Sequence, residues 1–417
     1  MNLATQIEEK QIGYWDFTGR QERGIHNICV YPATMVPNMQ KELIRMILQE
    51  KPKISNILDP FHGSGVTLVE GANSELAPIG IDINPLANLI TRVKLQGIDK
   101  KKIKKSISDI ENRLTSNSFQ YEKHSFQNIE KWYRDDFIDT FSKIRAAIIE
   151  EKSANIRKYF WVCLIDPLKK YSNTRSSTFK LHVKEENVIS SMEDNICVDF
   201  LAKIKKNYEL LPTFNRKRKI KLYIDDSSKI LKNMEGESID FICTSPPYGD
   251  NSTTVTYGQF SMLPIYWINR KDLGSFDNSL IQNYSSIDTS SLGGRKKKNR
   301  EDISSKIFND YLETISENKR SKVVSFVLDY FEVLKNFNHV LKKDGVVMMT
   351  IGNRRVDNKI LPLTELTKEF FKSLGYSVEA ELTRNIPTKR MPRKVSKVGE
   401  VAVESMNIEY VLIFQKH

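Results

Sequence analysis

Residues that bind metals or form disulfides are sparse in this chain. It contains four cysteines and six histidines among 417 residues. No two cysteines have Cys-x-x-Cys spacing and no histidine cluster lies beside them, which argues against a structural zinc site. We therefore expect no metal, and free thiols of the kind found in a reducing cytoplasm.

Long apolar stretches are also missing. No run of about eighteen apolar residues occurs, and this excludes a membrane-spanning helix. Residues 1–11 alternate charged and apolar side chains and contain no apolar core of a signal peptide. These absences predict a cytoplasmic protein with no membrane partner.

Charge is plentiful and unbalanced. Lysine and arginine total 64 against 52 aspartate and glutamate, so the formal net charge is +12 and the sequence pI is about 9.2. A basic surface suits a polyanionic partner such as nucleic acid. The length allows one large domain or two ordinary ones with a full hydrophobic core.

Two segments near the N-terminus combine a strand, a turn and an acid. Residues 57–65 (ILDPFHGSG) read as an apolar strand that ends in an acid and a glycine-rich turn, and a helical pattern follows. Residues 79–85 (IGIDINP) read as a second strand ending in Asp82. This layout is typical of a nucleotide-binding βαβ unit, in which glycines permit close approach of a ligand and the second acid accepts ribose hydroxyls.

A rigid polar segment follows a third apolar strand, residues 239–243. Residues 244–248 read Thr-Ser-Pro-Pro-Tyr. The two prolines fix the backbone and remove two amide donors, so carbonyl and hydroxyl acceptors remain beside a flat aromatic ring. Such a pocket suits a planar base with an exocyclic amine. A proline pair alone is also typical of an ordinary turn.

Taken together, these strings resemble the motifs of the S-adenosylmethionine-dependent amino-methyltransferases of DNA. Residues 59–65 resemble the cofactor motif, residues 79–85 the next one, and Ser-Pro-Pro-Tyr the catalytic motif. Members that methylate cytosine N4 commonly have Ser before the prolines, whereas adenine-specific members more often have Asp or Asn. The resemblance implies an α/β fold: a Rossmann-like class I methyltransferase sheet with helices on both faces and an antiparallel edge hairpin.

The resemblance also implies roles for individual residues. The catalytic set is Ser245, Pro246, Pro247 and Tyr248. The set that binds S-adenosylmethionine is Tyr31, Pro32, Ala33, Asp59, Phe61, Gly63, Ser64, Gly65, Asp82, Asn84 and Asp226. For Asp226, which follows a strand near residue 222, a helix N-cap is an alternative role. Cys243 is expected to be a thiol in the strand core, and no Pro-Cys dipeptide of the carbon-5 cytosine methyltransferases occurs.

The composition changes along the chain. Residues 1–98 are expected to form the N-terminal segment and the cofactor half, and residues 216–417 the catalytic half with a DNA-contacting segment at about 250–320. Between them, residues 99–215 carry charged amphipathic helical patterns; a connection of about 120 residues is far longer than the fold needs, so we predict a helical insert that could recognise the target. Basic candidates for DNA contact are Arg175, Lys180, Arg295, Lys296, Lys297, Lys389 and Arg390, although solvated loops and helix caps are alternative roles.

The sequence thus predicts a site-specific methyltransferase that acts on the N4 amine of a flipped-out cytosine in double-stranded DNA. A cognate restriction endonuclease is the expected partner in a restriction-modification system. The alternatives are N6-adenine methylation, an RNA amino-methyltransferase, and a catalytically inactive nucleic-acid binder that keeps the fold.

Overall fold

The computed structural model describes most of the chain. The described residues are 3–19, 24–175, 178–213, 219–249, 255–294, 303–386, 394–398, 401–404 and 407–417, with the backbone alone for 394–398 and 401–404.

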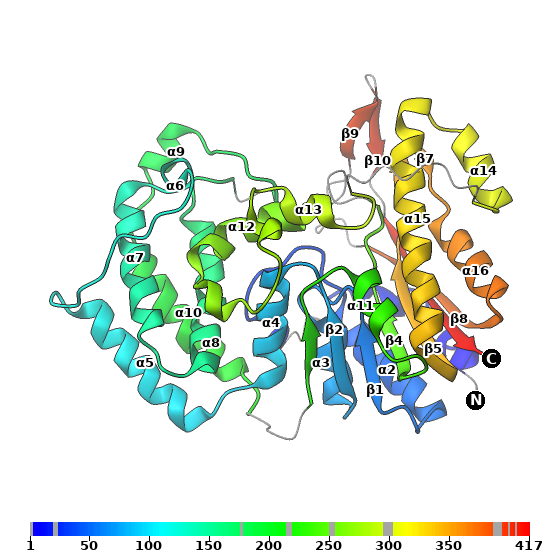
Figure 1. Ribbon diagram of the computed structural model, residues 1–417, viewed down its shortest axis with the longest axis horizontal. Helices are drawn as coiled ribbons and strands as arrows, with labels where there is room; N and C mark the ends of the chain where they lie inside the picture. Colours follow the sequence, from blue (N-terminus) through cyan, green and yellow to red (C-terminus); the bar gives the residue numbers. More distant parts are fainter. Residues whose placement is uncertain are drawn as a thin grey trace.

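A seven-stranded, mostly parallel sheet forms the centre of one of two bodies of the molecule (Figure 1). Its strand order is β3-β2-β1-β4-β5-β11-β8, in which β11 pairs antiparallel with both β5 and β8 and all other neighbouring strands are parallel. The strands are β1 Asn56–Asp59, β2 Ala77–Ile81, β3 Lys221–Tyr223, β4 Ile239–Thr244, β5 Leu341–Ile351, β8 Tyr376–Asn385 and β11 Ile408–Lys416. This confirms the predicted Rossmann-like α/β class, including the antiparallel strands at one edge.

Alternate strand residues enter two separate cores, as the pleat of a strand requires. On β4, Ile242 packs toward one core, and Phe241 and Cys243 toward the other. The first core lies under the helices that are nearest in Figure 1: α11 Ser227–Asn233, α14 Lys306–Glu313, α15 Glu317–Val340 and α16 Leu363–Ser373. The opposite face is covered by α1 Leu3–Glu8, α2 Pro37–Glu50 and α3 Val66–Asn73.

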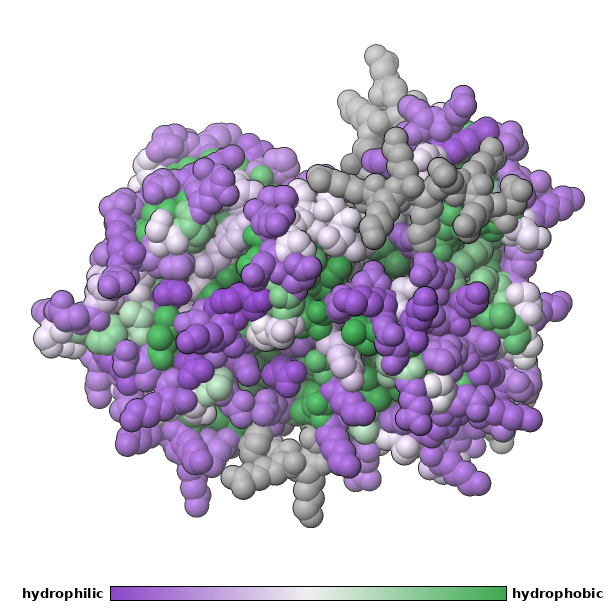
Figure 2. All heavy atoms as spheres, in the orientation of Figure 1, coloured by the Kyte–Doolittle hydropathy of each residue, from purple (hydrophilic) through white to green (hydrophobic). Residues whose placement is uncertain are grey.

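A second body of helices stands beside strand β3, and we call it the helical block. It consists of α5 Lys100–Thr115, α6 Ile129–Trp132, α7 Asp135–Ile149, α8 Ala154–Lys170, α9 Glu186–Ser190, α10 Ile196–Leu210, α12 Tyr257–Trp267 and α13 Ser286–Ser290. It shares one core with α4 Pro85–Gln96, which joins it to the sheet. Figure 2 shows hydrophobic side chains in the recess between the two bodies.

The helical patterns of the insert are more interrupted than the sequence predicts. Residues 129–149 form two helices, α6 and α7, rather than one, because Tyr133 and Arg134 are extended and Arg134 donates to the carbonyls of Ile189 and Met192. The region 187–210 divides into α9 and α10. Two short hairpins were not predicted: β6 Arg355–Val356 with β7 Lys359–Ile360, and β9 Lys394–Val398 with β10 Val401–Glu404.

A buried carboxylate fixes the segment after α12 to the helical block. Asp272, which is 3% exposed, accepts hydrogen bonds from Arg157 Nη2 at 3.0 Å and from Trp161 Nε1 at 2.9 Å. Arg157 Nε also donates to Asp272 Oδ2 at 3.0 Å, so the hydrogen bonding between the guanidinium and the carboxylate is bidentate. None of the helices in the described part of the chain has the length and apolar character needed to cross a membrane.

We predict that Asp272→Asn destabilises the fold. The amide keeps one acceptor but loses the charge that matches Arg157, so the free energy of unfolding should fall by roughly 1–3 kcal/mol. Urea denaturation measures this. Glu111→Gln is the control because Glu111 pairs with Lys205 at the surface, and a change within about 0.5 kcal/mol is expected. Equal stabilities for the Asp272 variant and the wild type would contradict the assignment.

Candidate active site

Two loops that are distant in the sequence lie side by side at the carboxyl edge of the sheet. The glycine-rich turn follows β1 and the Ser-Pro-Pro-Tyr segment follows β4, and these strands are parallel neighbours. A hydrogen bond joins the two strand ends: Thr244 Oγ1 donates to Asp59 Oδ1 at 2.7 Å across 185 residues of sequence. Ligands bind at this edge in open α/β sheets, so both motifs face one site.

Asp59 is a buried structural acceptor. It has no exposed surface, and it also accepts from the hydroxyl of Thr67 and, at 3.0 Å, from the backbone N–H of Phe61. Burial raises the pKa of Asp59 to about 6 although these hydrogen bonds act in the opposite direction. Both carboxylate oxygens of Asp59 accept hydrogen bonds from protein groups, so in this structure Asp59 holds the glycine-rich turn in place. A contact of Asp59 with a cofactor stays a prediction.

The turn itself is tight and is held by α4. Gly63 and Gly65 have φ values of 49° and 76°, and a Cβ on Gly65 would lie 2.5 Å from a methyl carbon of Thr91. Lys94 Nζ donates to the carbonyl of Ser64 at 2.7 Å. Burial lowers the pKa of Lys94 to about 8. A side chain at Gly65 would therefore push the turn away from α4.

Asp82 ends β2 beside this turn with capacity to accept more hydrogen bonds. Its Oδ2 accepts from Gly63 N and its Oδ1 from Asn84 N, both at 2.8 Å. A carboxylate can accept about four hydrogen bonds, and the side chain is only partly buried. Two acceptor positions therefore remain for a ligand.

An aromatic group forms the wall opposite Asp82, and we call Tyr31, Tyr257 and Phe260 the aromatic wall. The Tyr31 ring stacks on Tyr257 at 6.0 Å and meets Phe260 edge-on at 5.8 Å between centroids. Asn84 ties this wall to the sheet, because its Nδ2 donates to Tyr31 Oη at 3.2 Å and to Ser261 Oγ at 2.7 Å. Tyr257 and Phe260 lie outside the sequence motifs; their three-residue spacing on one helix is the signal that the sequence offers for them.

The remaining predicted cofactor residues differ in exposure. Pro32 is buried, and Ala33 is exposed with a φ of 44°. Phe61 is half-buried against the core under α11 and α15. Asp226 caps α11 by accepting from Lys229 N at 3.0 Å, and burial raises its pKa. The capping role left open by the sequence is therefore present, and a contact of Asp226 with the cofactor stays a prediction.

The Ser-Pro-Pro-Tyr segment is connected to the edge strands. Ser245 Oγ lies 3.1 Å from Tyr248 Oη, which donates to Glu409 Oε1 at 3.2 Å. Arg384 Nε donates to Glu409 Oε2 at 2.7 Å. Burial, with Glu409 as a second cause, holds the pKa of Tyr248 well above its ordinary value. Glu409 was missed by the sequence analysis because no motif points to a residue 161 positions after Tyr248.

The two prolines of the Ser-Pro-Pro-Tyr segment differ in burial, and Cys243, two residues before the segment, is buried. Pro246 is buried and Pro247 half-buried. The Cys243 side chain lies in the core and donates to Gln40 Oε1 at 3.5 Å, which confirms the predicted thiol in the strand core. All four cysteines are free thiols.

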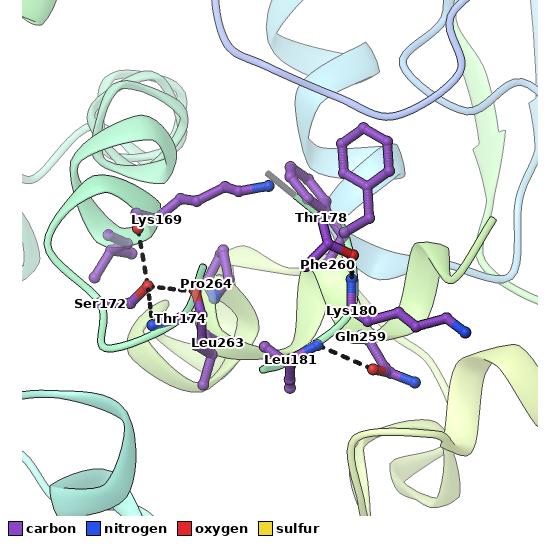
Figure 3. A pocket seen from close by; sticks show the side chains of 12 residues that line it. Lys169, Ser172, Thr174, Thr178, Lys180, Leu181, Gln259, Phe260, Leu263 and Pro264 are labelled. Carbon is purple, nitrogen blue, oxygen red and sulfur yellow. Dashed lines mark hydrogen bonds between the residues drawn. The ribbon is translucent and has the colours of Figure 1, made fainter. Parts of the chain in front are cut away.

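A narrow pocket lies next to the aromatic wall, between α8, α12 and the loop 174–183 (Figure 3). Lys169 Nζ lies 4.7 Å from the centre of the Phe260 ring and 4.9 Å from that of Phe179. Leu181 N donates to Gln259 Oε1 at 3.1 Å and so fastens the loop to α12. Phe179 remains 39% exposed. The loop therefore presents an aromatic ring and nearby cations at the border of the site.

The basic candidates for DNA contact fall into two groups. Arg175 and Lys180 are exposed on the loop 174–183. The others lie outside the described residues: Arg295, Lys296, Lys297, Lys389 and Arg390. Arg384, which precedes Lys389 and Arg390 in the sequence, is 5% exposed and pairs with Glu409, so its charge is used inside the protein.

A larger hollow of about 420 Å³ lies away from the Ser-Pro-Pro-Tyr segment. Its lining comes from α4, α8, edge strand β3, α11 and the segment 272–275. Asp225, rather than Asp226, lines it and pairs with Lys229 at 2.6 Å. Within the described ranges, no group of three or more histidine, cysteine or acidic side chains is arranged to hold a metal ion.

Two known proteins are similar to this chain, one over most of its length and one over a quarter of it. Type II methyltransferase M.MvaI of Kocuria varians is 29% identical over 425 residues, which covers 94% of this chain and 91% of the relative. The chain is similar to a type II methyltransferase. M.MjaII of Methanocaldococcus jannaschii, another type II methyltransferase, is 35% identical over 115 residues, or 25% of this chain and 21% of that protein. No protein-family model matches. The alignment with M.MvaI, the sheet order and the paired motif loops together support a methyltransferase.

The protonation of Asp59 gives a testable pH dependence. Its pKa is raised from 3.8 to about 6 in the folded protein, so the folded state binds this proton more tightly than the unfolded state. The stabilising contribution is therefore complete below about pH 4 and is lost as the pH rises to about 6. In urea denaturation, the stability of the wild type relative to Asp59→Asn should fall over this interval. A constant difference between the two proteins would contradict the assignment.

Proposed function

We propose that the protein is a site-specific DNA methyltransferase that transfers a methyl group from S-adenosylmethionine to the N4 amine of a flipped-out cytosine. The observation that carries this proposal is the hydrogen bond between Thr244 and Asp59, which joins the catalytic segment to the glycine-rich turn. A cofactor above β1 and a base beside Ser245 would then meet at one edge of the sheet. The similarity to type II methyltransferases supports DNA as the substrate.

The residues around the turn fit S-adenosylmethionine. The two open acceptor positions on Asp82 match the pair of ribose hydroxyls, and the turn at Gly63 and Gly65 permits close backbone approach. The aromatic wall supplies ring faces that suit a positively charged sulfur. When bound, S-adenosylmethionine supplies a methyl group on that sulfur. The protein residues hold and orient the reactants for an in-line transfer.

The catalytic segment suits an exocyclic amine. The Ser245 hydroxyl and the Pro246 carbonyl accept hydrogen bonds from the two amine hydrogens, which draws the nitrogen lone pair out of conjugation with the ring. Tyr248 stacks on the base. A paired base cannot reach these groups, so the cytosine leaves the duplex. Ser245 favours cytosine over adenine through the resemblance stated above, and the buried Cys243 is not placed as a carbon-5 nucleophile.

DNA recognition is assigned to two segments, the helical insert at 99–215 and residues 250–320. The support is the loop 174–183, where Phe179 and Lys180 line the pocket beside Phe260 of the aromatic wall. Arg175 is exposed on the same loop. Cationic side chains position the phosphate backbone, and they make affinity depend on salt. A restriction endonuclease with the same recognition sequence is the proposed partner.

Two variants should separate catalysis from cofactor binding. Ser245→Ala removes one acceptor at the amine, so methyl transfer to duplex DNA should fall by about 100-fold or more while calorimetry finds unchanged S-adenosylmethionine affinity. Asp82→Ala should lose that affinity. Ser190→Ala, on the surface of α9, is the control. Full transfer activity in Ser245→Ala would show that the mechanism is wrong.

Salt dependence tests the DNA contacts. Replacing both Arg175 and Lys180 with Gln should weaken duplex binding and reduce the slope of log affinity against log salt by roughly 1–2. Lys104→Gln with Lys105→Gln removes the same charge from exposed positions on α5, which lies far from the loop in Figure 1. The control should keep the wild-type slope. Equal slopes for the two double variants would rule out phosphate contacts by Arg175 and Lys180.

A further inference from the structure

A chain of hydrogen bonds runs from the catalytic serine to a buried ion pair on the edge strands. Glu409 on β11 and Arg384 on β8 are directly opposite each other in the antiparallel register. Their side chains are 19% and 4% exposed. Glu409 therefore meets Arg384 with one oxygen and Tyr248 with the other.

The direction of each hydrogen bond in this chain is fixed by its partners. An ionised carboxylate accepts only, and a hydroxyl has one hydrogen to donate. Arg384 has donors only, so in its ion pair with Glu409 the carboxylate is the acceptor. Tyr248 must then give its single hydrogen to Glu409. The remaining hydrogen bond, 3.1 Å between Ser245 Oγ and Tyr248 Oη, is consequently donated by Ser245.

We propose that Glu409 is a positioning residue that sets Ser245 as a hydrogen-bond acceptor for the target amine. Because the Ser245 hydrogen is committed to Tyr248, both lone pairs of the Ser245 oxygen face away from that bond and are open to an N–H of the substrate. The same contact holds the Tyr248 ring by its hydroxyl. This inference rests on the proposed function, since it assigns how that site recognises an amine.

Substitution at Glu409 should act on the chemical step. In Glu409→Gln the side-chain amide can donate a hydrogen bond to Tyr248. The Tyr248 hydroxyl can then donate to Ser245, so the direction of every hydrogen bond in the chain is reversed. Because hydrogen bonds to charged groups are strong, kcat should fall roughly ten- to hundredfold, while KM for DNA and for S-adenosylmethionine should stay within about twofold. Glu381→Gln is the matched control: Glu381 is a β8 residue with an ion pair to Lys368, and its kcat should be unchanged.

A double-mutant cycle separates this role from a structural one. Tyr248→Phe keeps the ring but breaks the chain, so adding Glu409→Gln to it should lower kcat by no more than about twofold further. The proposal would be overturned if the losses of kcat caused by Tyr248→Phe and by Glu409→Gln multiplied in the double variant. A wild-type kcat in Glu409→Gln would overturn it as well. If Glu409→Gln does not fold, the pair Tyr248→Phe and Ser245→Ala forms the cycle instead.

A spectroscopic measurement tests the chain independently of activity. Tyrosine labelled with carbon-13 at Cζ reports hydrogen bonding of each hydroxyl, and Tyr248→Phe identifies the Tyr248 signal. That signal should shift in Glu409→Gln and stay in place in Glu381→Gln. An unmoved signal in Glu409→Gln would overturn the proposal. A wild-type protein that methylates no DNA yet shows the shift would instead overturn the proposed function and leave the hydrogen-bond chain intact.

Discussion

The carboxylate of Asp59 is the constraint on which the site depends. It is buried, and among the residues that the structure describes, three neutral donors from Thr67, Thr244 and the backbone of Phe61 satisfy it. These donors come from the helix after β1, the end of β4 and the turn between β1 and α3. One side chain therefore fixes the separation of the glycine-rich turn and the Ser-Pro-Pro-Tyr segment. The raised pKa of Asp59 reflects the desolvation that this arrangement costs.

A second set of contacts fixes the outer walls of the site. Asn84 connects β2 to Tyr31 and, through Ser261, to α12. The aromatic wall thus joins the N-terminal segment, the sheet and the helical block in one cluster. On the other side, Arg384 and Glu409 connect the Ser-Pro-Pro-Tyr segment to β8 and β11. On both sides of the site, the side chains are fixed in place by contacts with other side chains. This arrangement suits a mechanism in which the protein positions the reactants.

The sequence was sufficient for the fold class and for the loops that carry the motifs. Apolar strands that end in acids and glycines are local signals, so β1, β2 and β4 and the turns after them were found. The contacts of Tyr257, Phe260, Arg384 and Glu409 could not be found in this way. They depend on which strands and helices are neighbours, and the ion pair of Arg384 with Glu409 requires the register of β8 against β11. The breaks between α6 and α7 likewise follow from a long-range contact of Arg134.

The chemistry of the target base is the central claim, and nucleoside mass spectrometry tests it most directly. Duplex DNA of mixed sequence would be incubated with the protein and S-adenosylmethionine, digested to nucleosides and separated. The acceptors at Ser245 suit an exocyclic amine, and the resemblance of Ser-Pro-Pro-Tyr to the motif of cytosine-N4 members selects cytosine. The account therefore predicts that N4-methylcytosine appears and that carbon-5 methylcytosine does not. Detection of N6-methyladenine alone would contradict the assignment of cytosine.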